Sequence, residues 1–308
     1  MSISHGAMYY FSNRLLYASI VGSAAWVLTS IRAASATTKY WIWVVTAFNF
    51  VVPSGALVDK LWARHLTWAR PLAAIGGPIW DMTEGRTVVL SVIWIDGAFF
   101  MLMRLMSRLR RERCQAQAPV RLSDRGATSH FVADGVRVSF GEGHPSPAVR
   151  GVLYPRILLP AGIDRLLNQR EFHAVLIQEL AHARRRDNLI CLLYEVSLCA
   201  LWFHPLIWLL GARIAHYREL SCDESVIRRA HGQALVSALA KLAVPEQGGV
   251  FEATASSHLS YRLARLAGPA QTTHRAANLI LTSLFAAVIA AGIFQTIAHT
   301  ACCFALKP

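Results

Sequence analysis

The sequence predicts a mostly α-helical integral membrane protein with four transmembrane helices and a cytosolic α+β domain. Three observations predict this class. Hydrophobic residues make up 54% of the 308 residues and charged residues only 16%, against about 25% charged in soluble proteins. Four apolar runs approach or exceed the ~17–25 residues that a spanning helix needs. Between the third and fourth runs, the pattern changes to short strands followed by amphipathic helices, which predicts a folded domain outside the bilayer.

The four runs set the predicted membrane topology. They are Leu15–Ile31, Tyr40–Val58, Thr87–Met103 and Ala276–Ala305. The first could instead be a secretory signal, because Ala34-Ser35-Ala36 resembles a cleavage site. However, this run exceeds the usual ~7–15-residue apolar core of a signal, and Arg32 separates it from that site. We therefore expect a retained membrane helix.

Basic residues flank the third and fourth runs and orient them. The formal charge is +13, and a cytosolic excess of Arg and Lys marks the inner ends of membrane helices. This predicts a membrane segment at residues 8–113, a cytosolic domain at 114–275 and a last helix with a short outer tail at 276–308. No nucleic-acid motif accompanies the charge, so we expect no direct nucleic-acid partner. The flanking residues are Arg104, Arg108, Arg110, Arg111, Arg113, Arg262, Arg265 and Arg275.

The predicted cytosolic domain begins with a small sheet. Gly135–Phe140 alternates with period two, and Ala148–Val152 and Arg156–Leu159 are further strand candidates. Pro155 precedes the last of these and favours an edge strand or a bulge. Arg156–Leu159 is then either an edge that pairs with a substrate backbone or simply the completion of the sheet. From Asn168 the pattern is helical to about Leu242.

The stretch AVLIQELAH, residues 174–182, carries the candidate chemistry. Residues 178 and 182 are four apart and share one helix face. With His at 178 the stretch would read H-E-x-x-H, in which two imidazoles bind zinc and the glutamate activates a bound water. The chain keeps the water activator, Glu179, and the second ligand, His182, but it has Gln178 in the first ligand position.

The surrounding motifs resemble the BlaR/MecR antirepressor family of membrane zinc metallopeptidases, which are gluzincin-like. The motifs are SPAVRGVLYPRILLP, HARRRDN, WFHPLIW and YRELSCDESVI. The resemblance covers Ser146 to about Arg229 and extends loosely over the membrane helices, including the Trp94-x-x-Gly97 run. It implies a zinc-binding domain in the bacterial inner, cytoplasmic membrane, with the catalytic domain cytosolic.

The resemblance also implies further site residues. By position, Glu219 and Asp223 would be acidic metal ligands, and their spacing of four places them on one helix face. Asp187 either orients the imidazole of His182 or forms a salt bridge within the run Arg184–Asp187. We expect Cys222, between the two acids, to face away from them and to pack.

A shared site restricts the path of residues Leu189–Ala212. As one helix, these residues would be about 36 Å long at ~1.5 Å per residue, enough to cross a ~30 Å hydrocarbon core. A single crossing would separate His182 from Glu219 by the membrane. We therefore expect a membrane-hugging helix pair, broken at His204-Pro205, with the site close to the inner surface.

Because Gln178 stands in the first ligand position, the sequence does not decide whether the protein cleaves peptides. A neutral amide oxygen is a poorer zinc donor than imidazole, so the Zn²⁺ site could be weakened or altered, empty, or completed by a water. The family implies a zinc metalloendopeptidase that cleaves a cytosolic regulator, such as a transcriptional repressor, or itself. The alternative is a lapsed pseudopeptidase that acts as a membrane signalling scaffold. Antibiotic sensors of this family carry a C-terminal penicillin-binding domain, which we do not expect here because the sequence ends at Pro308.

Overall fold

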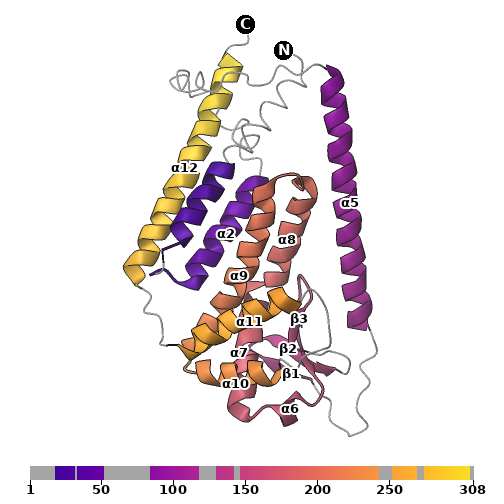
Figure 1. Ribbon diagram of the computed structural model, residues 1–308, viewed down its shortest axis with the longest axis vertical. Coiled ribbons are helices and arrows are strands. Elements are labelled where there is room, and N and C mark those ends of the chain that lie inside the picture. Colours follow the sequence, from indigo (N-terminus) through magenta and orange to yellow (C-terminus); the bar gives the residue numbers. More distant parts are fainter. Residues whose placement is uncertain are drawn as a thin grey trace. The chain divides into compact units, whose positions relative to one another are not determined.

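The computed structural model describes residues 18–31, 33–51, 84–117, 130–141, 146–242, 252–268 and 274–305 (Figure 1). The chain divides into two units. The first unit comprises residues 1–102, 197–213 and 273–308, and the second comprises residues 103–196 and 214–272. The predicted limits of the cytosolic domain, 114–275, stay a prediction. Residues 197–213 of that stretch, however, belong to the first unit.

The first unit is helical. It contains the short helix Ala18–Thr29, α2 (Ala36–Val51) and α12 (Arg275–Ala305), together with the N-terminal part of α5 (Glu84–Gln117). The short helix and α2 contribute fully buried side chains, and α12 packs against α2. The buried side chains are Val21, Tyr40, Trp43 and Leu281.

Among the described residues, one helix is long and apolar enough to cross a membrane. It is the 24-residue stretch Val88–Arg111 of α5, whose most apolar window is only 6% buried. Large apolar side chains such as Ile93, Phe99 and Phe100 are exposed along it, as expected for a helix whose surroundings are lipid. Ala18–Thr29 and Arg275–Ala291 are shorter apolar helices. The four-span topology stays a prediction.

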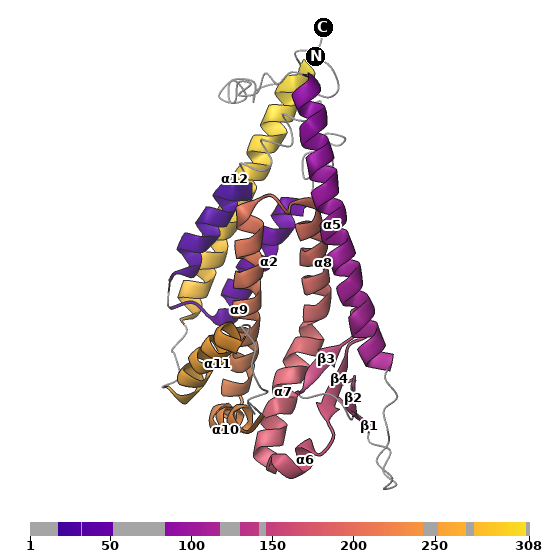
Figure 2. The same ribbon diagram turned by 45° about the vertical axis from the view of Figure 1, so that its right-hand side comes forward.

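Helices α8 (Asp187–Ala200) and α9 (Pro205–Ile227) form an antiparallel pair (Figures 1 and 2). Residues 201–204 connect them, and the amide of His204 donates to the carbonyl of Leu201 across this turn. Pro205 begins α9, where its missing N–H leaves no intrahelical bond unmade. The chain therefore returns instead of crossing once, as we expected from the shared site. That the pair lies against a membrane stays a prediction.

Three indole groups surround the turn between α8 and α9. Trp94 of α5 donates its Nε1–H to the carbonyl of Ala200 at 2.8 Å, and Trp202 donates back to the carbonyl of Trp94 at 3.3 Å. Trp208 of α9 donates to the carbonyl of Trp202 at 2.8 Å. Carbonyls at the end of a helix lack intrahelical partners, and the Trp94 indole supplies a donor for that of Ala200, the last residue of α8. We call Trp94, Trp202 and Trp208 the tryptophan cluster.

Gly97 lets the ring of Trp202 lie directly against α5. A Cβ at Gly97 would be 2.1 Å from the nearest ring carbon of Trp202, which no side chain tolerates. The Trp94-x-x-Gly97 run is therefore explained by packing: the tryptophan supplies a donor, and the glycine supplies the space.

The second unit contains a four-stranded sheet in the order β1-β2-β4-β3. β1 (His130–Ala133) pairs antiparallel with β2 (Val136–Gly141), β2 pairs parallel with β4 (Arg156–Pro160), and β4 pairs antiparallel with β3 (Ala148–Arg150). Of the two alternatives for Arg156–Leu159, the structure shows the second, in which the strand completes the sheet. Pro155 precedes the first residue of β4 and costs the ladder no hydrogen bond, so β4 lies inside the sheet and β3 forms an edge.

Besides the C-terminal part of α5 and the site-bearing ends of α8 and α9, the described part of the second unit contains four more helices. They are α6 (Ile163–Leu166), α7 (Gln169–Arg185), α10 (Gly232–Leu242) and α11 (Glu252–Ala267). Helix α7 contacts β3 and β4 and is itself contacted by α10. Its core residues pack with Val138, Ile157 and Leu159 of the sheet and Leu235 of α10. The sheet and α10 thus hold α7, which carries the candidate site.

Glu171 fixes the first turn of α7. Its carboxylate accepts from the backbone of Asn168, while the Asn168 side chain accepts from the backbone of Glu171, which forms a capping box. The same carboxylate accepts from Lys241 and Ser237 of α10. The ion pair with Lys241, with the Ser237 and Asn168 hydrogen bonds, lowers the pKa of Glu171 to about 2.

Candidate functional site

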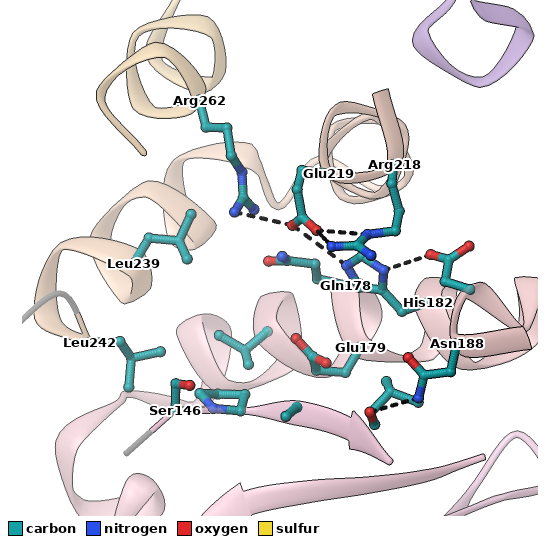
Figure 3. Close-up of a pocket in the computed structure, with 15 residues that line it drawn as sticks. Ser146, Gln178, Glu179, His182, Asn188, Arg218, Glu219, Leu239, Leu242 and Arg262 are labelled. Carbon is teal, nitrogen blue, oxygen red and sulfur yellow. Dashed lines mark hydrogen bonds and ion pairs between the residues drawn. The ribbon is translucent and has the colours of Figure 1, made fainter. Parts of the chain in front are cut away.

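Helix α7 presents Gln178, Glu179 and His182 to one cleft of the second unit (Figure 3). The cleft has a volume of about 420 Å³. One wall is the segment 146–149, which leads into the edge strand β3, and α7, α8, α9, α10 and α11 contribute the rest. Gln178 is only 6% exposed, so its amide belongs to the cleft floor. The helix face predicted from the spacing of residues 178 and 182 is therefore formed.

His182 is held by Asp187, at the start of α8. Nδ1 of His182 lies 2.7 Å from Oδ2 of Asp187, so the imidazole donates to the carboxylate. Asp187 also accepts two hydrogen bonds from Arg185, at 2.7 and 2.6 Å. Both alternatives for Asp187 are thus present: it orients the imidazole, and it forms a salt bridge within the arginine run.

The pKa values of this pair follow from the contacts. Burial lowers the pKa of His182, but the hydrogen bonds to Asp187 and Cys222 and the negative charge of Glu219 together outweigh burial and raise the pKa well above its ordinary value. Burial raises the pKa of Asp187, yet the bonds from Arg185 and His182 reverse this and lower it. The pair therefore favours an ionised carboxylate beside a readily protonated imidazole.

Glu219 of α9 faces the other nitrogen of the same imidazole. Its Oε2 lies 3.7 Å from Nε2 of His182. Two arginines also contact this carboxylate: Arg218 at 3.1 Å through Oε1, and Arg262 of α11 at 3.3 Å through Oε2. Figure 3 shows the two guanidinium groups reaching Glu219 from different helices. The structure thus brings together two of the predicted ligands, His182 and Glu219.

Asp223 is engaged elsewhere. Arg262 donates Nη2–H to Oδ1 at 2.7 Å and Nε–H to Oδ2 at 2.9 Å, a two-pronged pairing that uses both carboxylate oxygens. Within the described part of the chain, the His, Cys, Asp and Glu side chains that could share an ion are those of His182, Asp187 and Cys222. Asp223 is not in that group, and its role as a metal ligand stays a prediction.

Cys222 is buried, as expected, and its side chain lies within the site. Its buried Sγ lies 3.1 Å from Nη2 of Arg185 and close to the side chains of His182 and Asp187. Residue 222 follows 219 by three positions, and residues three apart are neighbours on a helix surface.

Glu179 is suited to exchange a proton near neutral pH. Burial raises the pKa of its carboxyl to about 6, although the positive charges of His182, Arg262 and Arg218 oppose the rise. A general base works best when its pKa lies near the working pH. Glu179 retains this property although Gln178 replaces the neighbouring ligand.

Three arginines of the site were not singled out from the sequence. Arg185 donates to Asp187, to Ser221 Oγ at 2.7 Å and to the carbonyl of Arg218 at 3.1 Å, so it ties α9 to the start of α8. Arg218 also donates to Cys191 of α8. Arg262 was interpreted as a membrane-flanking charge. Its partner Asp223 lies 39 residues away in sequence, so no local pattern indicates the contact.

The residues present do not fit a catalytic zinc ion. Such sites use three protein ligands and leave one position for water. Here His182 Nε2 and Glu219 Oε2 supply two nearby donors, and the third position holds the amide of Gln178. Asp223 is paired with Arg262, and Glu219 is flanked by two guanidinium groups.

Comparison with known proteins identifies similar sequences. Residues 78–266 match the family described as BlaR1 peptidase M56. The chain is 22% identical over 153 residues to the methicillin resistance mecR1 protein of Staphylococcus aureus, covering 47% of this chain and 26% of that protein. It is 39% identical over 87 residues to the regulatory protein BlaR1 of Bacillus licheniformis, covering 27% of this chain and 14% of that protein. The matched stretches therefore span about a quarter or less of these relatives.

Proposed function

The chain belongs to the BlaR1 peptidase M56 family, a family of zinc metallopeptidases with relatives in signal transduction, and from this we propose that it is a lapsed member. It would act as a multi-pass protein of the bacterial inner membrane that binds a cytosolic protein in the M56 cleft without hydrolysing it. A transcriptional repressor is the partner that its relatives suggest. The observation that carries the proposal is Gln178 in the first ligand position, with the acids of α9 neutralised by arginines.

The shape of the cleft supports a polypeptide as the ligand. Ser146–Val149 forms one wall and leads along the edge strand β3, and edge strands bind extended peptides by adding a strand. Leu239 and Leu242 of α10 give the cleft an apolar part. Backbone pairing with apolar contact suits a protein segment better than a small polar metabolite.

An active metalloendopeptidase is the second candidate, and Glu179 favours it. The carboxyl that would activate a water is retained, with a pKa of about 6. The hydrogen bond from His182 to Asp187 also keeps the imidazole oriented. In this alternative, the protein cleaves a cytosolic regulator or itself.

Proteolysis by three proteins separates the two candidates. The natural protein, Gln178→His and Glu179→Gln would be purified in detergent with zinc, and cleavage of labelled casein and of the chain itself would be followed by gel electrophoresis and mass spectrometry. We expect the natural protein to cleave no faster than Glu179→Gln. Cleavage by the natural protein that Glu179→Gln abolishes would establish the active enzyme instead. Cleavage gained only in Gln178→His would support the lapsed site directly.

Binding without hydrolysis needs its own measurement. A purified winged-helix repressor, the partner class that the family resemblance implies, would be titrated against the natural protein and against Leu239→Arg, which places a charge on the apolar part of the cleft. We expect saturable binding that Leu239→Arg weakens at least about tenfold, a difference of 1.4 kcal/mol. Equal affinity of both proteins would show that the cleft does not hold the repressor.

A further inference from the structure

Arg262 reaches the site from α11 and contacts two acids of α9 at once. Its side chain is only 14% exposed, and that of Asp223 is 3% exposed. Two of its nitrogens pair with Asp223, while Nη1 lies 3.3 Å from Oε2 of Glu219. A planar guanidinium is suited to such pairing, because its donors are fixed in a fork that matches carboxylate oxygens. The geometry is that of a built interaction between two helices.

The guanidinium of Arg262 lies where a bound metal ion would need to reach Glu219. A cation bound between Nε2 of His182 and Oε2 of Glu219 would use the same carboxylate oxygen that Arg262 contacts. Arg218 occupies the other oxygen of Glu219. A divalent ion would therefore enter beside two fixed positive charges, in surroundings where burial strengthens repulsion between like charges.

We infer that Arg262 takes the place of a metal ion in this centre: its guanidinium neutralises Glu219 and Asp223, joins α9 to α11, and keeps divalent cations out. The inference rests on the proposed function in one respect: in both, the site works without zinc. It adds that the centre is complete as folded, and that Arg262 excludes the ion in addition to the loss of a ligand at Gln178.

Thermal unfolding with and without zinc tests the inference on the full-length protein in detergent. The Tm of the natural protein should change neither with zinc nor with EDTA. Arg262→Gln leaves Glu219 and Asp223 without their shared counter-ion, so its Tm in EDTA should fall. Zinc should then raise that Tm by several degrees, because an ion that binds the folded state stabilises it.

Three further variants serve as controls. Arg265→Gln removes a positive charge from the same helix, three residues away, and should show no response to zinc. Arg262→Lys keeps the charge without the fork and should remain insensitive to zinc. Arg262→Gln combined with Glu219→Gln should lose the zinc response, because the carboxylate that would receive the ion is gone.

Two results would overturn the inference. First, the Tm of the natural protein could rise with zinc and fall with EDTA, which would mean that an ion already binds beside Arg262. This test does not depend on the folding of any variant. Second, an Arg262→Gln protein that folds but whose Tm does not rise with zinc would show that Arg262 does not keep divalent cations out of the site. The second result leaves the proposed function intact, whereas cleavage by the natural protein would remove the proposed function whichever way Arg262→Gln behaves.

Discussion

The two ends of the α8–α9 pair are held in different ways. At the turn end, in the first unit, indole N–H groups donate to backbone carbonyls, and a glycine makes room for an aromatic ring. At the site end, in the second unit, charged side chains make almost every contact, with Arg185, Asp187 and His182 at the centre. The turn end therefore depends on shape and the site end on charge. Substitutions should separate these two dependences.

The largest effect is expected from Arg185→Met at the site end. The substitution keeps much of the side-chain volume but removes every donor, and it leaves Asp187 buried with one partner fewer. Breaking a buried ion pair in this way costs about 3–5 kcal/mol. Chemical denaturation of the variant should show this loss. A loss below about 1 kcal/mol would mean that the charged network does not hold the site end together.

The next largest effect is expected from Gly97→Val at the turn end. Its Cβ would overlap the ring of Trp202, and overpacking costs about 1–3 kcal/mol or more. The matched control is Val92→Leu, an exposed position on the same helix, which should be near neutral. Comparable Tm values for the two variants would contradict the packing of α5 against the turn.

Trp94→Phe should have a smaller effect, because it removes only the hydrogen bond from the indole to the carbonyl of Ala200. A single neutral hydrogen bond contributes about 0.5–1.5 kcal/mol. Because neither group is ionised, the loss should be the same at low and high salt. A strongly salt-dependent loss would show that charge contributes at this end too.

A pH-dependent effect is expected from Glu171 in the second unit. Its pKa is about 2 in the folded protein against 4.5 ordinarily, so the ionised carboxylate stabilises the fold. This contribution is complete above about pH 4.5 and is lost as the pH falls from there towards 2. Glu171→Gln should therefore lower the Tm near neutral pH and flatten its decline in that window. An unchanged acid decline would rule out the Lys241 pairing as its cause.

Local sequence patterns predicted which residues share a helix face in the site, but they did not predict which residues of other helices contact them. The helical face of Gln178, Glu179 and His182 follows from spacing alone. The return of α8 and α9 followed from a geometric requirement, since one ion cannot be shared across a membrane. The sequence could not indicate that Arg262 meets Asp223, because that contact depends on how α11 packs.

The open points of the sequence have physical reasons as well. Pro155 favoured an edge strand or a bulge, but a proline immediately before a strand removes no ladder bond and so does not decide the strand's place in the sheet. Cys222 was expected only to pack, and its closeness to His182 and Asp187 could not be read from the sequence, because it depends on how α9 meets α7 and α8. The first two predicted membrane runs lie partly outside the described residues, so the full topology stays a prediction.

Zinc content tests the central claim most directly. The natural protein and His182→Ala would be purified in detergent from cells grown with added zinc, dialysed without chelator, and measured by inductively coupled plasma mass spectrometry. The account predicts far less than about one zinc per chain in the natural protein, the amount a catalytic site holds, and no difference from His182→Ala. About one zinc per chain that disappears in His182→Ala would contradict it.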